Sequence, residues 1–270
     1  MRGSVRPLAE RPGAEARAPA RMRPWLVLLI AWLAMSVERT DAYDPDDLQR
    51  LQGTGYQSCR VCDLAGARLA GSNLVEADLA GSSLREADLA GAYLAGANLF
   101  QADLTNANLE QANLISAALD WAKLQGARLT GATLDDASLD WADMEHADLR
   151  GASLEAATLS FARLTGACLA GVRLADANLF RADLSGADLS EADLRHASLA
   201  ESNLTGACLR GADLTAADLR GVYLAGADFT CAVLAPRSLS PDASPGVTSS
   251  SLAPLRFCMR LYQRREQRHE

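Results

Sequence analysis

Residues 77–101 read ADLAG SSLRE ADLAG AYLAG ANLFQ, and this five-residue rhythm runs unbroken from Asp63 to Leu234. Leucine fills every fifth position of that segment, 35 positions in all, except where Met144 and Phe229 replace it. A small residue, almost always alanine, stands two positions before each of the 35 leucine positions. Helices bury residues three and four apart, and strands bury alternate residues, so neither element fits this spacing. The spacing therefore predicts short extended segments separated by a turn in every repeat.

The turn is visible in the residue two positions after each leucine, which is glycine in 15 repeats. Glycine lowers the steric cost of a tight turn. Four turns close a square coil of 20 residues in which leucine stacks on leucine from coil to coil. A fixed short period of this kind indicates a solenoid, and 35 repeats make about nine coils. The expected fold class is all-β.

Units such as Ala77-Asp78-Leu79-Ala80-Gly81 and Ala182-Asp183-Leu184-Ser185-Gly186 follow the pattern A-[DNS]-L-x-G. This pattern resembles the pentapeptide-repeat family, and the resemblance covers about 172 of the 270 residues. It implies a right-handed quadrilateral β-helix with short helical caps; the spacing alone does not set the handedness. The chain is more similar to exported members than to the quinolone-resistance members.

Residues 1–42 are expected to hold a disordered leader followed by a segment that resembles a signal peptide, residues 22–42. Arg23 precedes an apolar run over residues 25–35, and small residues stand before Tyr43. The run is short for a membrane span, which favours a cleaved export signal. A membrane anchor and a buried helix are the alternatives. Export implies the periplasm, the extracellular space or, for a plastid protein, the thylakoid lumen, with no stable membrane span after cleavage.

Residues 43–62 are expected to cap the first coil. Asp44 suits the N-cap of a short helix with Pro45 at its first position. Leu48 and Leu51 would then cover the apolar end of the coil, which otherwise faces water.

Cys59 and Cys62 close this segment, and exported members of the family carry a similar Cys-x-x-Cys-Asp-Leu entry into the repeats. In an oxidising compartment the two cysteines would form a structural disulfide. Unpaired thiols and a redox pair are the alternatives, although a thioredoxin-like role needs a βαβ setting.

The other end consists of a Ser/Pro-rich linker, residues 235–254, and a basic helix or tail, residues 255–270. The tail is interpreted either as a cap or frayed end, or as a contact for an acidic surface. The repeat segment holds 24 acidic and 11 basic side chains, a charge of −13 within a chain total of −8. This balance argues against nucleic acid as a direct ligand.

Five aromatic residues gather on one side of the predicted coils. Three of them are spaced by 20 residues and occupy the turn position, so they should stack in one column. The set, named here the aromatic stripe, is Phe100, Trp121, Trp141, Phe161 and Phe180. It is either a ladder that stabilises the corner, with or without cover from the C-terminal segment, or a surface for a protein partner or a second copy. Asp120, Asp140 and Arg181 would form its polar rim.

No catalytic, cofactor or metal constellation emerges from the remaining residues. The three histidines (His146, His196 and His269) fall on different faces or in the tail. Cys168 and Cys208 share a column but lie two coils apart, about 9–10 Å, which is too far for a disulfide. Aspartates before the leucines alternate with neutral or basic residues along the first and second columns, which avoids repulsion between coils; Asp193 and Asp213 break this rule on the third.

The chain is therefore interpreted as a non-catalytic scaffold or protein-binding module that is exported, and not as an enzyme. Its partner is an unidentified protein, and dimerisation would use the aromatic stripe or the C-terminal segment. The alternative is a cytosolic DNA mimic that binds a type II topoisomerase, as the quinolone-resistance members of the family do.

Overall fold

The computed structural model describes residues 43–53, 55 and 58–234. The expected leader and signal-like segment, the Ser/Pro-rich linker and the basic tail lie outside the described residues. Within the described part of the chain, no helix is long and apolar enough to cross a membrane.

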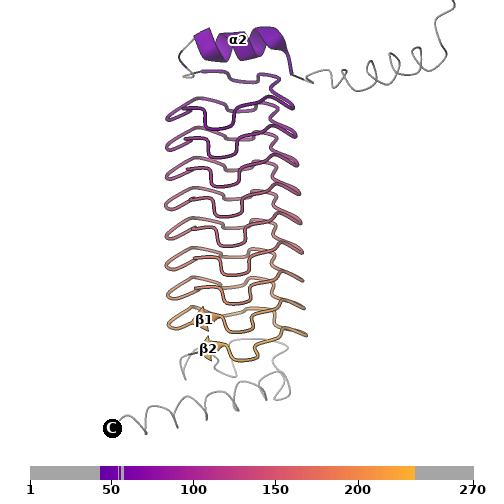
Figure 1. Ribbon diagram of the computed structural model, residues 1–270. Helices are drawn as coiled ribbons and strands as arrows, with labels where there is room; N and C mark the ends of the chain where they lie inside the picture. Colours follow the sequence, from indigo (N-terminus) through magenta and orange to yellow (C-terminus); the bar gives the residue numbers. More distant parts are fainter. Residues whose placement is uncertain (1–42, 54, 56–57, 235–270) are drawn as a thin grey trace, which may run out of the picture. The chain divides into compact units, whose positions relative to one another are not determined.

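The described elements are α2 (Pro45–Gly53), β1 (Asp213–Leu214) and β2 (Val233–Leu234). Between α2 and β1 the chain winds as a stack of square coils (Figure 1). Single parallel bridges join residues 20 positions apart, such as Asp63 with Ser83, and β1 pairs with β2 in the same register. Each coil thus holds four repeats. Each side of the square is a short extended segment that pairs with the next coil mostly through a single bridge.

The core is a column of leucines with alanines beside it. Every repeat leucine is buried, and Met144 and Phe229, which replace leucine, are 0% and 1% exposed. Ser82 and Ser202 take the alanine position and are fully buried. Ser82 Oγ donates a hydrogen bond to the Cys59 carbonyl (3.0 Å) and another to the Leu79 carbonyl. The core is therefore filled by small, regular units that repeat from coil to coil, with few polar side chains among them.

The backbone turns through the left-handed region once in every repeat. Glycine at this position has a positive φ, as at Gly151 (63°), and so do 20 non-glycine residues, from Val61 (55°) to Cys231 (63°). A type II turn requires a positive φ at its third residue. The turn therefore imposes the same backbone conformation whether or not the sequence supplies glycine.

Polar side chains tie the coils together on the outside. Asp63 Oδ1, for example, accepts a hydrogen bond from the backbone N–H of Ala65 (3.2 Å), which braces its own turn. An asparagine one coil on donates to the aspartate, as Asn98 Nδ2 does to Asp78 (2.9 Å). The alternation seen in the sequence thus does more than separate like charges, because it builds hydrogen-bonded columns.

Helix α2 packs over the first coil. Asp44 Oδ1 accepts the N–H of Asp46 (2.9 Å), which is the contact of an N-cap. Both backbone groups of Asp63 bond to this segment. Its carbonyl accepts the N–H of Asp44 (2.9 Å), and its N–H donates to Asp47 Oδ2 (2.8 Å). Leu51 is fully buried in the core and Leu48 packs partly against it. The helix therefore extends the leucine core beyond the first coil.

Candidate protein-binding surface

Three rings of the aromatic stripe form a parallel stack. The centroids of Trp121 and Trp141 are 4.9 Å apart with planes 2° from parallel, and those of Trp141 and Phe161 are 4.3 Å apart at 5°. These separations match the spacing of about 4.8 Å between neighbouring strands. The pitch of the solenoid therefore sets the rings at stacking distance. Trp121, Trp141 and Phe161 are called the aromatic stack below.

The aromatic stack occupies a costly backbone position. Its three residues have φ values of 61°, 62° and 60°. The left-handed region costs a residue with a Cβ about 1–2 kcal/mol, and a bulky residue there is an outlier. Stacked aromatic pairs contribute about 0.5–1.5 kcal/mol beyond the area they bury. Two stacking contacts thus offset only part of the strain of three residues, where glycine would carry none.

The aromatic stack exposes ring edges more than ring faces. Trp141 has Trp121 on one face and Phe161 on the other, so its 46% exposure comes mainly from its edge. Trp121 is 50% exposed. Ring edges carry partial positive charge, and the indole N–H is a hydrogen-bond donor. The aromatic stack can therefore meet an aromatic face, a carbonyl or an aliphatic side chain.

One end of the aromatic stack is closed by Phe180 and Arg181. Phe180 meets Phe161 edge-on, with centroids 5.7 Å apart and planes at 90°. The Arg181 guanidinium carbon lies 5.1 Å from the Phe180 centroid and 5.9 Å from that of Phe161. Glu201 holds this guanidinium with an Nη2–Oε2 distance of 2.6 Å. The stack thus ends in a cation–π contact whose charge is balanced by a carboxylate.

Phe100 lies apart from the other members of the aromatic stripe. Its side chain is 40% exposed, and it has no ring contact among the described residues. The reason is its position in the repeat. Gln101, not Phe100, stands 20 residues before Trp121 and so occupies the turn position of the same column. Phe180 shares the position of Phe100 in its repeat but still reaches Phe161 edge-on.

Asp120 and Asp140, the expected polar rim, are partly buried and also accept hydrogen bonds from the neighbouring coils. Asp120 Oδ1 accepts the N–H of Asp140 (3.0 Å) and the hydroxyl of Ser138 (2.5 Å). Asp140 Oδ1 accepts the N–H of Ser160 (2.7 Å). On this side the residues before the leucines are Ala118, Ser138 and Thr158, which lack a carboxylate or amide. The aspartates after the leucines supply the missing acceptors, a substitution that the sequence pattern does not reveal.

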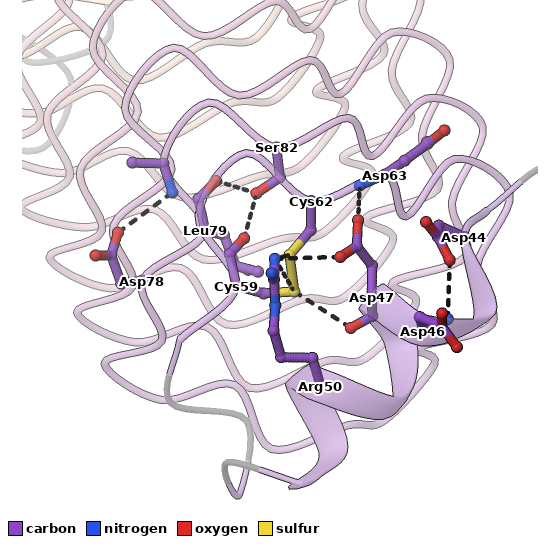
Figure 2. The surroundings of a disulfide bond; sticks show 11 residues. Asp44, Asp46, Asp47, Arg50, Cys59, Cys62, Asp63, Asp78, Leu79 and Ser82 are labelled. Atoms are coloured by element: carbon purple, nitrogen blue, oxygen red, sulfur yellow. Dashed lines mark hydrogen bonds and ion pairs between the residues drawn. A yellow bond between two sulfur atoms is a disulfide. The ribbon is translucent and has the colours of Figure 1, made fainter.

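Cys59 and Cys62 form a disulfide between α2 and the first coil, with Cα atoms 5.5 Å apart and each residue 1% exposed (Figure 2). Arg50 Nη2 lies 2.6 Å from Cys62 Sγ and 3.2 Å from Asp47 Oδ1. Ligand atoms of Asp47 and the two cysteines lie within 4.8 Å of one another. Thiolates are the sulfur ligands of metals, and a disulfide offers none. The disulfide therefore closes the turn by which the chain enters the repeats, and its sulfurs are not thiolate ligands for an ion.

The other candidate groups stay apart. Cys168 is an exposed thiol and Cys208 a partly buried one. His146 and His196 lie at turn positions on opposite sides of the square, and His269 and Cys258 lie outside the described residues. Among the described ones, Cys168, Cys208, His146 and His196, no two side chains share a site.

Ion pairs between an aspartate and an arginine of the same turn recur on the rest of the described surface. The side chain of Arg150 donates to Asp148 and lowers the pKa of that carboxyl below its ordinary value of 3.8. Asp193 and Asp218 stand in the same relation to Arg195 and Arg220, and their pKa values are lowered for the same reason. A general acid at neutral pH needs a raised carboxyl pKa, so these shifts favour stable ion pairs over acid–base chemistry.

The sequence matches the family described as pentapeptide repeats, in eight copies, over residues 62–99, 92–131, 137–176, 177–215 and 207–235. HetL, a pentapeptide repeat protein involved in heterocyst differentiation regulation in the cyanobacterium Nostoc sp. strain PCC 7120, is 31% identical; the match covers 72% of this chain and 98% of HetL, with a TM-score of 0.41.

Two further solved structures are more distant. AT2G44920, a pentapeptide repeat protein from the thylakoid lumen of Arabidopsis thaliana, is 28% identical over 50% of this chain and 88% of its own, with a TM-score of 0.32. QnrB1, a plasmid-mediated fluoroquinolone resistance protein, is 16% identical over 67% and 94%, with a TM-score of 0.38. No curated protein matches the chain. The repeats and the 20-residue register together make this chain a member of the pentapeptide-repeat family, with the right-handed β-helical solenoid that membership implies.

Proposed function

We propose that this protein is a non-catalytic binding module, exported from the cytoplasm, that holds a protein partner against the aromatic stack. The observation that carries the proposal is the exposure of Trp121 and Trp141 at strained turn positions. Glycine would carry no strain there and occupies 15 of the 35 turn positions, while the other 20 hold mostly polar residues.

A protein is the partner that suits this surface best. Tryptophan is enriched among the residues that dominate binding energy at protein interfaces. The strip combines apolar edges with indole N–H donors, and an ion pair, Arg181 with Glu201, borders it. Protein interfaces combine an apolar centre with a polar rim in the same way.

Two observations support a non-catalytic role. The carboxylates with resolved pKa shifts in the described part of the chain are shifted downward, toward the ionised form. The two described histidines, His146 and His196, lie on opposite sides of the square and so cannot act on one substrate atom. The pentapeptide solenoid thus supplies a surface, and its polar groups serve the stability of the coils.

Export is supported by the signal-like segment and by the disulfide. The apolar run over residues 25–35 with its positive flank is typical of a signal peptide. A disulfide between Cys59 and Cys62 persists in an oxidising compartment and is rare in the cytosol. The cytosolic alternative is a DNA mimic that binds a type II topoisomerase. The charge of −13 on the repeats is compatible with it, whereas the signal-like segment and the disulfide favour export.

The test begins with the full chain, tagged at its C-terminus and crosslinked in its native cell. Partners recovered outside the cytoplasm are purified, and their affinity is measured for the wild-type protein and for Trp141→Gly. Glycine fits the φ of 62° and removes the middle ring. We expect affinity to fall roughly 30-fold or more, as for an interface hot spot worth about 2 kcal/mol. The melting temperature should change little, because relief of strain offsets the lost stacking.

Two controls separate the surface from general effects. Trp141→Phe keeps the stack and should keep most of the affinity. Tyr93→Ala removes another aromatic ring, 55% exposed on a different side, and should bind as the wild type does. Equal binding by Trp141→Gly would overturn the proposed surface. An uncleaved chain in the cytoplasm that inhibits gyrase supercoiling would favour the DNA-mimic alternative instead.

A further inference from the structure

An open hollow lies just beyond the closed end of the aromatic stack, on the same corner of the solenoid. Its volume is about 340 Å³, and its walls include Phe180, Ala200, Glu201 and Arg220. The column of residues that follow the leucines runs from Phe180 through Ala200 to Arg220, one residue per coil. Two long side chains thus flank one methyl group, and the hollow is the space that a longer side chain at position 200 would fill.

The spacing of this hollow suits a flat ring. Phe180 and Arg220 are two coils apart, which corresponds to about 9–10 Å along the solenoid. A planar group between them would lie about one coil spacing, 4.8 Å, from each level. The Phe180 ring stands at 90° to the Phe161 ring, so a ring parallel to the aromatic stack would meet Phe180 at the same angle. The notch can therefore hold a ring against Phe180 in the edge-to-face arrangement that Phe161 makes with it from the neighbouring coil.

The walls offer the chemistry that an aromatic ring needs. Phe180 contributes an apolar ring. Arg220 is 82% exposed, and its guanidinium is held flat against Asp218 by bonds from Nε to Oδ1 (2.9 Å) and from Nη2 to Oδ2 (2.6 Å). A planar guanidinium stacks well on an aromatic face. A ring in the notch would thus have Phe180 on one side and a pre-oriented cation on the other.

Glu201 adds a polar anchor to the lining of the hollow. Arg181 binds its Oε2 from Nε (2.7 Å), while its Oε1 accepts no hydrogen bond from the described residues. Gly221 lets this side chain lie where it does, since a Cβ there would stand 3.2 Å from Glu201 Cγ. A free carboxylate oxygen beside an aromatic slot matches a phenol hydroxyl, which donates well to an ionised acceptor.

We propose that this hollow binds a tyrosine side chain of the partner protein, whose ring lies between Phe180, which it meets edge-to-face, and Arg220, and whose hydroxyl donates to Glu201. The inference rests on the proposed function, because it names the residue that the partner inserts beside the aromatic stack. It adds a pocket to a surface that otherwise offers mainly ring edges.

The direct test uses p-cresol, the side chain of tyrosine, titrated into the full-length protein. NMR follows the Nε–H signal of Arg220 and the ring signals of Phe180. Both should shift along one saturable curve in the millimolar range. The alicyclic analogue 4-methylcyclohexanol has a similar size and a hydroxyl but no flat ring. Its affinity should be roughly fivefold lower than that of p-cresol, because the aromatic pairing is lost. Absence of saturable shifts, or equal binding of the two probes, would overturn the proposal.

Variants extend the test to the partner itself. Ala200→Phe fills the hollow with a side chain of the protein itself. It should abolish the p-cresol shifts and lower the affinity for the partner. Ala170→Phe places the same side chain at the equivalent position on another side and should change neither. If Trp141→Gly lowers the affinity for the partner and Ala200→Phe does not, the partner does not use the hollow, and the tyrosine proposal fails while the proposed surface stands. If neither variant lowers that affinity, the proposed function fails as well.

Discussion

At the scale of single residues, the turn position explains most of the sequence choice. Its positive φ makes glycine the unstrained residue, yet 20 other residues also adopt it. Some of them have a visible compensation, as Trp121 and Trp141 have through stacking. Ala156, with a φ of 56° and an exposed methyl group, has none that the structure shows.

This difference predicts opposite effects for a matched pair of substitutions. Ala156→Gly should raise the free energy of unfolding by about 0.5–1 kcal/mol, because relief of about 1–2 kcal/mol of strain exceeds the extra entropy that glycine loses on folding. Gly151→Ala should lower it by a similar amount. A Cβ on Gly151 meets nothing within 4 Å, so only its φ of 63° opposes the change. Urea denaturation measures both, and a loss of stability in Ala156→Gly would show that the turn is unstrained.

Side-chain partners mark the limit of prediction from the sequence at this scale. The 20-residue spacing of Trp121, Trp141 and Phe161 is sufficient to align them in one column. The contact of Arg181 with Phe180 is not visible in the spacing, because it depends on how two long side chains turn at neighbouring positions. The hollow at Ala200 is equally hidden, since it arises where a small residue stands between two long ones.

At the scale of elements, the cap formed by α2 and the disulfide is distinct from the repeats. It carries hydrogen bonds to Asp63 and buries Leu51 in the core. Its helix start could be anticipated from Asp44 and Pro45, because capping chemistry is local. The contact of Arg50 with Cys62 could not, since it depends on how the helix docks on the coil.

Removing the disulfide should loosen this end alone. The bridge closes a short loop, with a sequence separation of 3, so its loss should cost about 2 kcal/mol. Repeats in a solenoid contact mainly their neighbours, and the effect should therefore stay local. Hydrogen exchange in Cys59→Ser/Cys62→Ser should quicken in the first coil and remain unchanged near residues 139–164. The control is Cys168→Ser, which alters an exposed thiol outside the disulfide. Uniform quickening along the chain would contradict this local picture.

At the scale of the whole molecule, the ion pairs within turns govern the response to acid. The arginine side chains hold the pKa values of Asp148, Asp193 and Asp218 below 3.8 in the folded protein. The unfolded chain therefore binds protons more readily as the pH falls. These carboxylates stabilise the fold above pH 3.8, and that stabilisation is lost as the pH drops through their lowered values.

The free energy of unfolding should accordingly change little between about pH 5 and pH 7 and decline below about pH 4. A variant with Arg150→Gln, Arg195→Gln and Arg220→Gln should lose less stability over the same acid range, because its aspartates no longer prefer ionisation in the folded state. Urea titrations at each pH measure the slope. An identical acid slope in the two proteins would assign acid sensitivity to other groups.

The repeat segment could be predicted from the sequence more fully than its surroundings. Leucine every fifth residue requires a turn in every repeat, and the bridges 20 residues apart show the square that four turns close. Handedness follows from family membership and not from the spacing, since a left-handed square would bury the same leucines. The pattern says nothing about residues without a period, which is why the ends of the chain rested on local signals such as Asp44 and the apolar run.

The 20-residue register has a consequence for how genes of this kind can change length. Inserting or deleting 20 codons adds or removes one full circuit, and every column stays aligned. A change of five codons also preserves the leucine core, but it rotates all downstream residues by one side of the square. Placed between Trp121 and Trp141, it would leave the two indoles on adjacent sides. The core thus tolerates insertion or deletion of any whole number of repeats. The surface keeps its columns only when the number of repeats added or removed is a multiple of four.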